Sequence, residues 1–156
     1  MSLIELDDID RRILTALQNN ARISNVELAR MVGLSPSPCL RRVKTLEDCG
    51  VIQRYVSLLD QGAVGFPVSV FVNVTLERQV ESALEQFEAA IRQRPEVLEC
   101  YLMTGDADYL LRVVTRDLAS YERFLVDHLA RIPGVSSIKS SFALKQVSYR
   151  TALPLK

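Results

Sequence analysis

The residues best suited to binding a charged partner lie in the stretch "SPSPCLRRVKT", residues 35–45. Arg41, Arg42 and Lys44 provide three positive charges there, and no acidic residue occurs between positions 36 and 46. Cations of this kind neutralise phosphates, and arginine also pairs with guanine through two hydrogen bonds. The stretch therefore indicates a surface for nucleic acid. Because basic side chains on a solvated helix are common, the neighbouring elements have to support this interpretation.

Two prolines fix how the chain enters the helix that carries these charges. The residue before a proline avoids the α region, so Ser35 and Ser37 are expected to be extended. We therefore predict that the helix begins at Pro38 with Ser37 as its N-cap. A start one turn earlier is the alternative, because first-turn amides have no intrahelical acceptor. The free amides at this end favour phosphate, and the two serine hydroxyls lie beside them.

The remaining residues of this helix divide into an inner and an outer face. The apolar positions are expected to face inward: Leu40, Val43 and Leu46. The opposite face is polar and carries Arg41, Lys44 and Thr45, with Arg42 beside them. Gly50 is expected to end the element. A polar face of this composition is available to DNA.

Two shorter helices are predicted upstream. Residues 8–19 place Ile9, Ile13, Leu14 and Leu17 on one helical face. A capping box of Ser24 and Glu27 starts the next helix, whose buried stripe is Leu28, Ala29 and Val32. Gly33 can take the left-handed conformation that ends such a helix.

Three helices followed by the β-prone segment "VIQRYVSLL" are typical of a winged helix-turn-helix. In that motif the second helix of the pair lies in the major groove of DNA. Arg54, in the strand expected after the third helix, is then predicted to contact the flanking DNA backbone. We assign residues 1–56 to this DNA-binding domain and residues 57–65, "SLLDQGAVG", to a linker.

The rest of the chain, residues 66–156, has a different pattern. Alternating apolar residues predict a first strand over positions 66–76, and a helical period follows over positions 80–91. Two β-rich segments, "VLECYLMT" and "YLLRVVT", are joined by the turn "GDAD". A second helix over positions 121–129 and a last strand over positions 136–149 complete the order β-α-β-β-α-β. The fold class is α+β, with a ferredoxin-like second domain.

A ferredoxin-like sheet has one face covered by helices and one face open. Phe71 points to the open face of the first strand. We therefore expect this face to pack against another subunit, and the protein to be at least a dimer.

Bulk properties agree with a cytoplasmic protein. The 19 basic and 19 acidic residues balance, so the chain as a whole is neutral. Positive and negative charges are concentrated in different segments of the chain. No apolar run approaches the length of a membrane span, and "MSLIELDDID" does not resemble a signal peptide. Three widely spaced cysteines argue against a disulfide framework and for a reducing compartment.

Three other functions were weighed against DNA binding. An enzyme is disfavoured because the cysteines and the single histidine lack metal-ligand spacing and no glycine-rich phosphate loop occurs. An RNA-recognition module shares the β-α-β-β-α-β order, but "YLLRVVT" lacks its aromatic signature. A metabolic sensor without DNA binding leaves the basic helix unexplained. We expect no catalysis, no metal and no cofactor.

The stretches "RISNVELARMVGLSPSPCLRRVKTLEDCGVI" and "MTGDADYLLRV" resemble the leucine-responsive regulatory protein/AsnC family of bacterial transcription regulators. The resemblance covers nearly the whole chain. It implies a helix-turn-helix at about residues 25–44, a ferredoxin-like RAM domain that binds amino acids, and dimers that assemble into octamers or other higher oligomers. It also implies control of promoters for amino-acid metabolism or transport.

The same resemblance places an amino-acid effector at the "GDAD" turn, where two dimers meet. Its loop corresponds to Gly105, Asp106, Ala107, Asp108 and Tyr109, and Ser140 and Ser141 of the last strand are expected to line the same cleft. Either Asp106 or Asp108 can accept from the effector ammonium, and amides around Gly105 can donate to its carboxylate. Met103 and Tyr109 are expected to contact its side chain. Leucine or another apolar amino acid is the first expectation.

Overall fold

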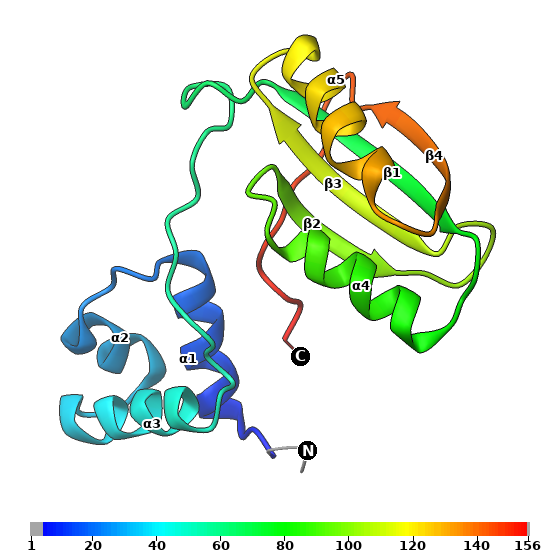
Figure 1. Cartoon of the computed structure of the whole chain (residues 1–156). Coiled ribbons are helices and arrows are strands. Elements are labelled where there is room, and N and C mark those ends of the chain that lie inside the picture. Colours follow the sequence, from blue (N-terminus) through cyan, green and yellow to red (C-terminus); the bar gives the residue numbers. More distant parts are fainter. Residues whose placement is uncertain (1–4, 156) are drawn as a thin grey trace. The chain divides into compact units, whose positions relative to one another are not determined.

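The computed structural model describes residues 5–155, which form two compact units (Figure 1). The N-terminal unit contains the described residues up to Leu58 and, in addition, the C-terminal segment from Ser148 onward. The second unit spans Leu59–Val147. The outer limits of the predicted domains, residues 1 and 156, lie outside the described residues. The structure thus groups the end of the chain with the beginning.

Local hydrogen bonds define the first two helices as the sequence predicts. Helix α1, Asp8–Asn19, begins with a capping box between Asp7 and Asp10. Helix α2, Asn25–Val32, begins with the predicted box, in which the Ser24 hydroxyl accepts from the Glu27 amide and the Glu27 carboxylate accepts from the Ser24 amide. Gly33 follows at φ 75°, the left-handed conformation expected of it.

Helix α3, Pro36–Asp48, begins two residues before the predicted start. Ser35 is its N-cap, with extended backbone and no side-chain capping bond. The prediction of Ser37 as an extended N-cap is therefore wrong, because Ser37 lies inside the first turn. Pro36 and Pro38 are both tolerated there, since first-turn amides have no intrahelical partner.

The three helices enclose a small apolar core of their own. Ile13 and Cys39 are fully buried, and the other buried members are Leu14, Ala16, Leu28, Ala29, Val32 and Leu46. Leu40, predicted to face inward, is instead 57% exposed. The inward row of α3 runs through Cys39, Val43 and Leu46 at i, i+4 and i+7, so Leu40 is turned away from the core.

The β-prone segment after α3 forms no strand in the part of the chain that the structure describes. The Ile52 amide donates to the Leu46 carbonyl at 3.0 Å, and residues 53–60 then carry no regular secondary structure. The strand predicted to contain Arg54 is therefore wrong. A strand needs a hydrogen-bonded neighbour, and the described residues of the N-terminal unit form no strand that could pair with this segment.

The second unit has the predicted β-α-β-β-α-β order. Its elements are β1 Val68–Leu76, α4 Glu81–Arg92, β2 Val97–Leu102, β3 Tyr109–Thr115, α5 Leu118–Asp127, a 3-10 turn Leu129–Arg131, and β4 Val135–Phe142. The strands lie in the order β2-β3-β1-β4, and every neighbouring pair is antiparallel. Both helices cover the same face of this sheet (Figure 1).

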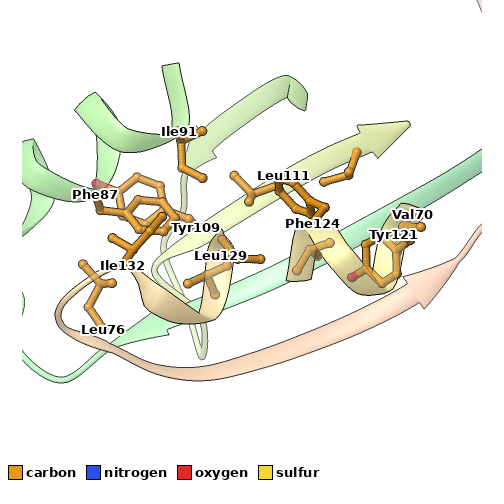
Figure 2. Close-up of a cluster of buried hydrophobic side chains, with 13 residues drawn as sticks. Val70, Leu76, Phe87, Ile91, Tyr109, Leu111, Tyr121, Phe124, Leu129 and Ile132 are labelled. Carbon is orange, nitrogen blue, oxygen red and sulfur yellow. The ribbon is translucent and has the colours of Figure 1, made fainter. Parts of the chain in front are cut away.

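Alternation along β1 decides which face is buried. Val70, Val72 and Val74 are fully buried under the helices, together with Phe87 of α4 and Phe124 of α5 (Figure 2). The intervening residues of β1 point to the open face, where Phe71 is 39% exposed. The sequence pattern therefore predicted both faces correctly.

The last strand is shorter than predicted. β4 ends at Phe142, and the Ala143 amide makes one further bond to the Ser69 carbonyl at 2.9 Å. The partner strand β1 begins at Val68, so no ladder remains for later residues. Among the described residues, no helix is both long enough and apolar enough to cross a membrane.

Candidate functional site

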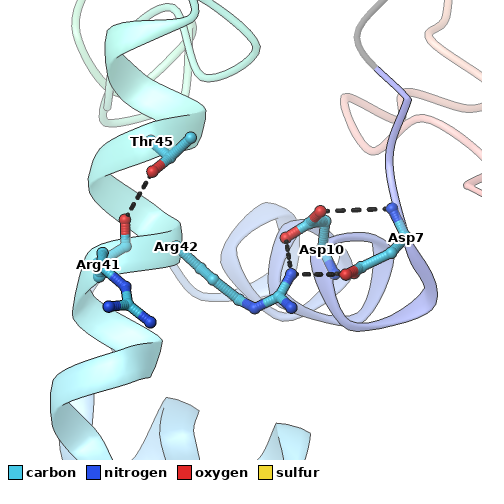
Figure 3. A network of polar contacts seen from close by, with 5 residues as sticks. All are labelled: Asp7, Asp10, Arg41, Arg42 and Thr45. Atoms are coloured by element: carbon cyan, nitrogen blue, oxygen red, sulfur yellow. Dashed lines mark hydrogen bonds and ion pairs between the residues drawn. The ribbon is translucent and has the colours of Figure 1, made fainter.

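Helix α3 presents two cations to solvent. Arg41 and Lys44 are both exposed, as are the Ser35 and Ser37 positions at the helix start, whereas Pro38 is half-buried. The Thr45 hydroxyl donates to the Arg41 backbone carbonyl at 3.0 Å (Figure 3). The Arg41 guanidinium takes no part in this bond. The outer face of α3 is therefore exposed and carries two positive charges.

Asn25 holds the beginning of α3 against α2. Its side-chain amide donates to the Pro36 carbonyl at 2.8 Å. This contact joins the first turns of the two helices across the turn between them. Sequence reasoning missed this role, although an asparagine just after the Ser24 cap was the available signal.

Arg42 is placed differently from its two basic neighbours. Its guanidinium lies 2.7 Å from an Asp7 carboxylate oxygen and 2.8 Å from an Asp10 oxygen (Figure 3). The pKa of Asp7 is lowered by the Asp10 amide and then by Arg42, and these carboxylates raise the pKa of Arg42. Arg42 thus ties α3 to the start of α1, and two negative charges compensate its positive charge.

Arg54 lies exposed in the irregular segment after α3. Its neighbour Tyr55 donates a hydrogen bond to Glu47 of α3 at 2.7 Å. Burial, and then this bond, raise the pKa of Tyr55 to about 12, so the phenol stays a donor. The contact holds the segment beside α3, although no strand is formed.

A pocket of about 310 Å³ lies beside the predicted effector loop. Its lining comes from three parts of the chain: Asn73 and Thr75 of β1, Lys139 of β4, and the loop residues Met103, Thr104, Asp106 and Ala107. Asn73 pairs directly with Lys139 in the sheet, which places both on the open face. Gly105, within the loop, has φ 125°, a conformation that residues with a side chain rarely adopt.

The pocket holds one acid and one base. Within residues 5–155 neither Asp106 nor Lys139 takes part in an ion pair. Met103 and Asp106 were predicted from the sequence, whereas Asn73, Thr75 and Lys139 were not. For the two β1 residues, the available signal was their polar character at outward positions of a strand whose inward positions are all apolar.

Asp108 is separated from this pocket and is only 5% exposed. Its carboxylate accepts hydrogen bonds from the Leu76 amide at 2.7 Å and from the Gln79 side chain at 2.5 Å. Its own amide donates to the Val74 carbonyl at 3.0 Å. The sequence left open whether Asp106 or Asp108 binds the effector ammonium. In the structure Asp106 lines the pocket, and Asp108 is hydrogen-bonded to the end of β1.

Tyr109 also points away from the pocket. Its side chain is 1% exposed, its ring centroid lies 4.5 Å from that of Phe87, and its hydroxyl donates to Glu88 at 3.1 Å. Burial, and then the Glu88 carboxylate, raise the pKa of Tyr109. It belongs to the core under α4.

The two serines of β4 lie on opposite faces of the sheet. Ser140 pairs with the buried Val72 and forms a hydrogen bond with the Tyr121 hydroxyl on the helix side. Ser141 pairs with Phe71 on the open face. The pocket contains neither of them, and their neighbour Lys139 lines it instead.

Replacing Asp108 by alanine is expected to destabilise the second unit. The Leu76 amide loses its buried acceptor, which costs about 1–3 kcal/mol. In a domain of this size each kcal/mol lowers the melting temperature by roughly 4–8 °C. Thermal unfolding checks this, with Asp106→Ala as the matched control. Equal losses in both variants would contradict the different roles given to these two acids.

Both halves of the chain match known families. A winged helix-turn-helix DNA-binding model matches residues 6–53, and a model of the Lrp/AsnC ligand binding domain matches residues 69–153. The chain belongs to the Lrp/AsnC family. This Lrp/AsnC protein is a DNA-binding transcription regulator with a ligand-binding domain, and it is not an enzyme.

Two relatives support the assignment over the full length. The chain is 51% identical to the Bkd operon transcriptional regulator of Pseudomonas aeruginosa over 153 residues, covering 98% of this chain and 100% of the relative. It is 43% identical to the leucine-responsive regulatory protein of Escherichia coli K12 over 152 residues, covering 97% and 93%. This Lrp/AsnC protein is therefore similar to both regulators over nearly its whole length.

Solved structures agree with the fold. A transcriptional regulator of Neisseria meningitidis, solved as an L-Met complex, has a TM-score of 0.92 and 44% identity, with 97% of each chain covered. An AsnC family regulator of Agrobacterium tumefaciens has a TM-score of 0.91 and 42% identity, covering 96% of this chain and 97% of that one.

Proposed function

We propose that this Lrp/AsnC regulator binds duplex DNA through the exposed face of α3 and changes its binding when an apolar amino acid occupies the pocket beside residues 103–107. The observation that carries the proposal is that one chain combines two exposed cations, Arg41 and Lys44, on the second helix of the helix-turn-helix with a pocket holding one acid and one base. Genes of amino-acid metabolism or transport are the proposed targets, and the cytoplasm is the proposed compartment.

For DNA, Arg41 and Lys44 are the proposed primary contacts. Both are exposed on the second helix of the helix-turn-helix pair, the helix that enters the major groove. Ser35, Ser37, Pro38 and Thr45 border them, and Arg54 extends the basic surface beyond the helix. Arg42 is proposed to act mainly by holding α3 against α1, because its charge is already neutralised by two carboxylates.

For the effector, the pocket supplies complementary groups. Asp106 is suited to accept from an ammonium, and the Lys139 ammonium to bind a carboxylate. A volume of about 310 Å³ lies at the lower end for ligand sites, which favours one small molecule. Met103 offers an apolar surface, so leucine or methionine is the proposed class of effector. The L-Met complex of the Neisseria relative supports this choice.

Assembly is proposed through the open face of the sheet. Phe71 is 39% and Tyr101 is 52% exposed there in the single chain, although both belong to strands of a packed domain. A second copy that covers this face would form a symmetric dimer. Because the pocket opens on the same face, dimers meeting near residues 103–107 would complete it, as an octamer or another higher oligomer would require.

Thermal shift of the wild-type protein against each of the twenty amino acids tests the effector proposal. A ligand at a hundred times its Kd stabilises the folded state by about 2.7 kcal/mol, so leucine, methionine or a similar residue is expected to raise Tm by several degrees. Light scattering of the same samples measures the oligomer. If none of the twenty shifts Tm, or only charged amino acids do, the proposed effector class fails.

A further inference from the structure

The chain passes between its two compact units twice. The first passage follows Leu58, and the second follows Val147, after which the C-terminal segment belongs to the N-terminal unit. Residues 143–150, which precede the docked end, are exposed and have no regular secondary structure. The docked end therefore reaches the helix-turn-helix unit on a short tether, and its contacts there need an explanation.

Gln18 of α1 holds the segment by two hydrogen bonds. Its side-chain oxygen accepts from the Leu153 amide at 2.6 Å, and its side-chain nitrogen donates to the Leu153 carbonyl at 3.2 Å. A glutamine side chain used in this way satisfies both backbone groups of one residue, as a neighbouring strand would. The contact fixes the position of the segment along α1.

Apolar packing accompanies these bonds. Leu155 is partly buried against the core cluster of the three helices. Leu153, Leu155 and Thr151 line a groove of about 500 Å³ together with residues of α1 and of the segment after α3, among them Leu14, Leu17, Ile52 and Tyr55. The C-terminal segment thus contacts the same elements that hold α3 in place.

The docked segment follows β4 in the chain, after the tether of residues 143–150. Lys139 of that strand lines the ligand pocket, and the chain reaches Leu153 only fourteen positions later. Residues 143–150 join β4 to the docked end, so the strand that lines the ligand pocket and the segment that binds α1 belong to one continuous stretch of chain.

We propose that the surface of α1 around Gln18 is a docking surface for residues 151–155 of this same chain, and that docking transmits effector binding to the helix-turn-helix. The transmission part rests on the proposed function. The segment exchanges between a docked and an undocked state, and both effector and DNA shift the equilibrium between these two states. An effector that moves β4 changes the docked fraction and, through α1, the support of α3.

Two variants weaken docking at separate points: Gln18→Ala removes both hydrogen bonds, and Leu155→Asp places a charge against the apolar core of the three helices. Leu144→Asp is the matched control, because Leu144 is 99% exposed in the tether. In the full-length protein without ligands, hydrogen exchange of the α1 amides is expected to become roughly tenfold faster in both docking variants and unchanged in the control.

The same proteins then report on transmission. Calorimetry with L-methionine and with L-leucine is expected to give Kd values within twofold of wild type, since neither variant touches the pocket. The change in DNA affinity that the amino acid causes is expected to fall to less than twofold in Gln18→Ala and Leu155→Asp and to persist in Leu144→Asp.

Unchanged α1 exchange in both docking variants would overturn the docking surface. Faster exchange with a full effector response would overturn transmission. If the wild-type protein itself ignores every amino acid, the proposed function fails, and the exchange measurement still decides the docking surface separately.

Discussion

Replacing Arg41 and Lys44 together by alanine is expected to weaken binding to an operator duplex roughly a hundredfold at moderate salt. Both side chains are exposed, and neither takes part in an ion pair among residues 5–155, so their removal leaves no buried charge behind. The melting temperature should therefore stay at the wild-type value. The operator is obtained by selecting random duplexes on the wild-type protein, and affinity is measured by fluorescence anisotropy.

Salt dependence separates a direct contact from an indirect one. Each phosphate contact that is lost makes the slope of log K against log salt shallower by about one unit. The control is Arg78→Ala with Lys145→Ala, which removes the same charge from exposed positions of the second unit. Equal loss of affinity in the control would show a general charge effect, and an unchanged affinity in the α3 variant would contradict the assigned face.

Arg42 provides a contrast within the same helix. Its guanidinium is bound by Asp7 and Asp10, so an Arg42→Met change removes a link between α3 and α1 as well as a charge. The sequence did not reveal this, because a local pattern shows which face a residue occupies but not which distant acid reaches it. Asp7 and Arg42 are 35 positions apart.

Features encoded by a few adjacent residues were predictable. The Ser24–Glu27 capping box and Gly33 fixed the bounds of α2, and strict alternation in β1 fixed the buried face of the sheet. The start of α3 was missed because two rules compete there: Pro38 disfavours α backbone at Ser37, yet the first turn tolerates both prolines. The helix begins two residues earlier by accepting this local conflict.

Features that depend on strand pairing or on remote contacts were not predictable. Lys139 enters the pocket because it pairs with Asn73, and that register is set by the whole sheet. The sequence leaves Asp106 and Asp108 as equal alternatives, and the hydrogen bond from the Leu76 amide to Asp108 distinguishes them. Likewise, no local pattern in "TALPL" indicates that Gln18 binds its backbone. Long-range partners decide these roles.

The ligand pocket gives the second large expected effect. Asp106→Asn and Lys139→Met are each expected to weaken binding of L-methionine or L-leucine by about 10- to 100-fold, the cost of one charge-assisted hydrogen bond of about 1.5–3 kcal/mol. Isothermal calorimetry on the full-length protein measures this. Glu77→Gln and Lys145→Met are the controls, since both are exposed and neither lines the pocket.

Ligand analogues assign each end of the effector to one side chain. N-acetyl-L-methionine lacks the ammonium, so it should bind wild type more weakly than L-methionine, whereas Asp106→Asn should bind the two alike. L-methionine amide lacks the carboxylate, so wild type should bind it more weakly than L-methionine. Lys139→Met should bind L-methionine and its amide with similar affinity. The opposite pairing of variant and analogue would reverse the orientation of the ligand. Affinity within twofold of wild type in both variants would place the effector elsewhere. A zwitterion bound in this small pocket lies close to both the Asp106 carboxylate and the Lys139 ammonium, so loss of either charge has to change its affinity.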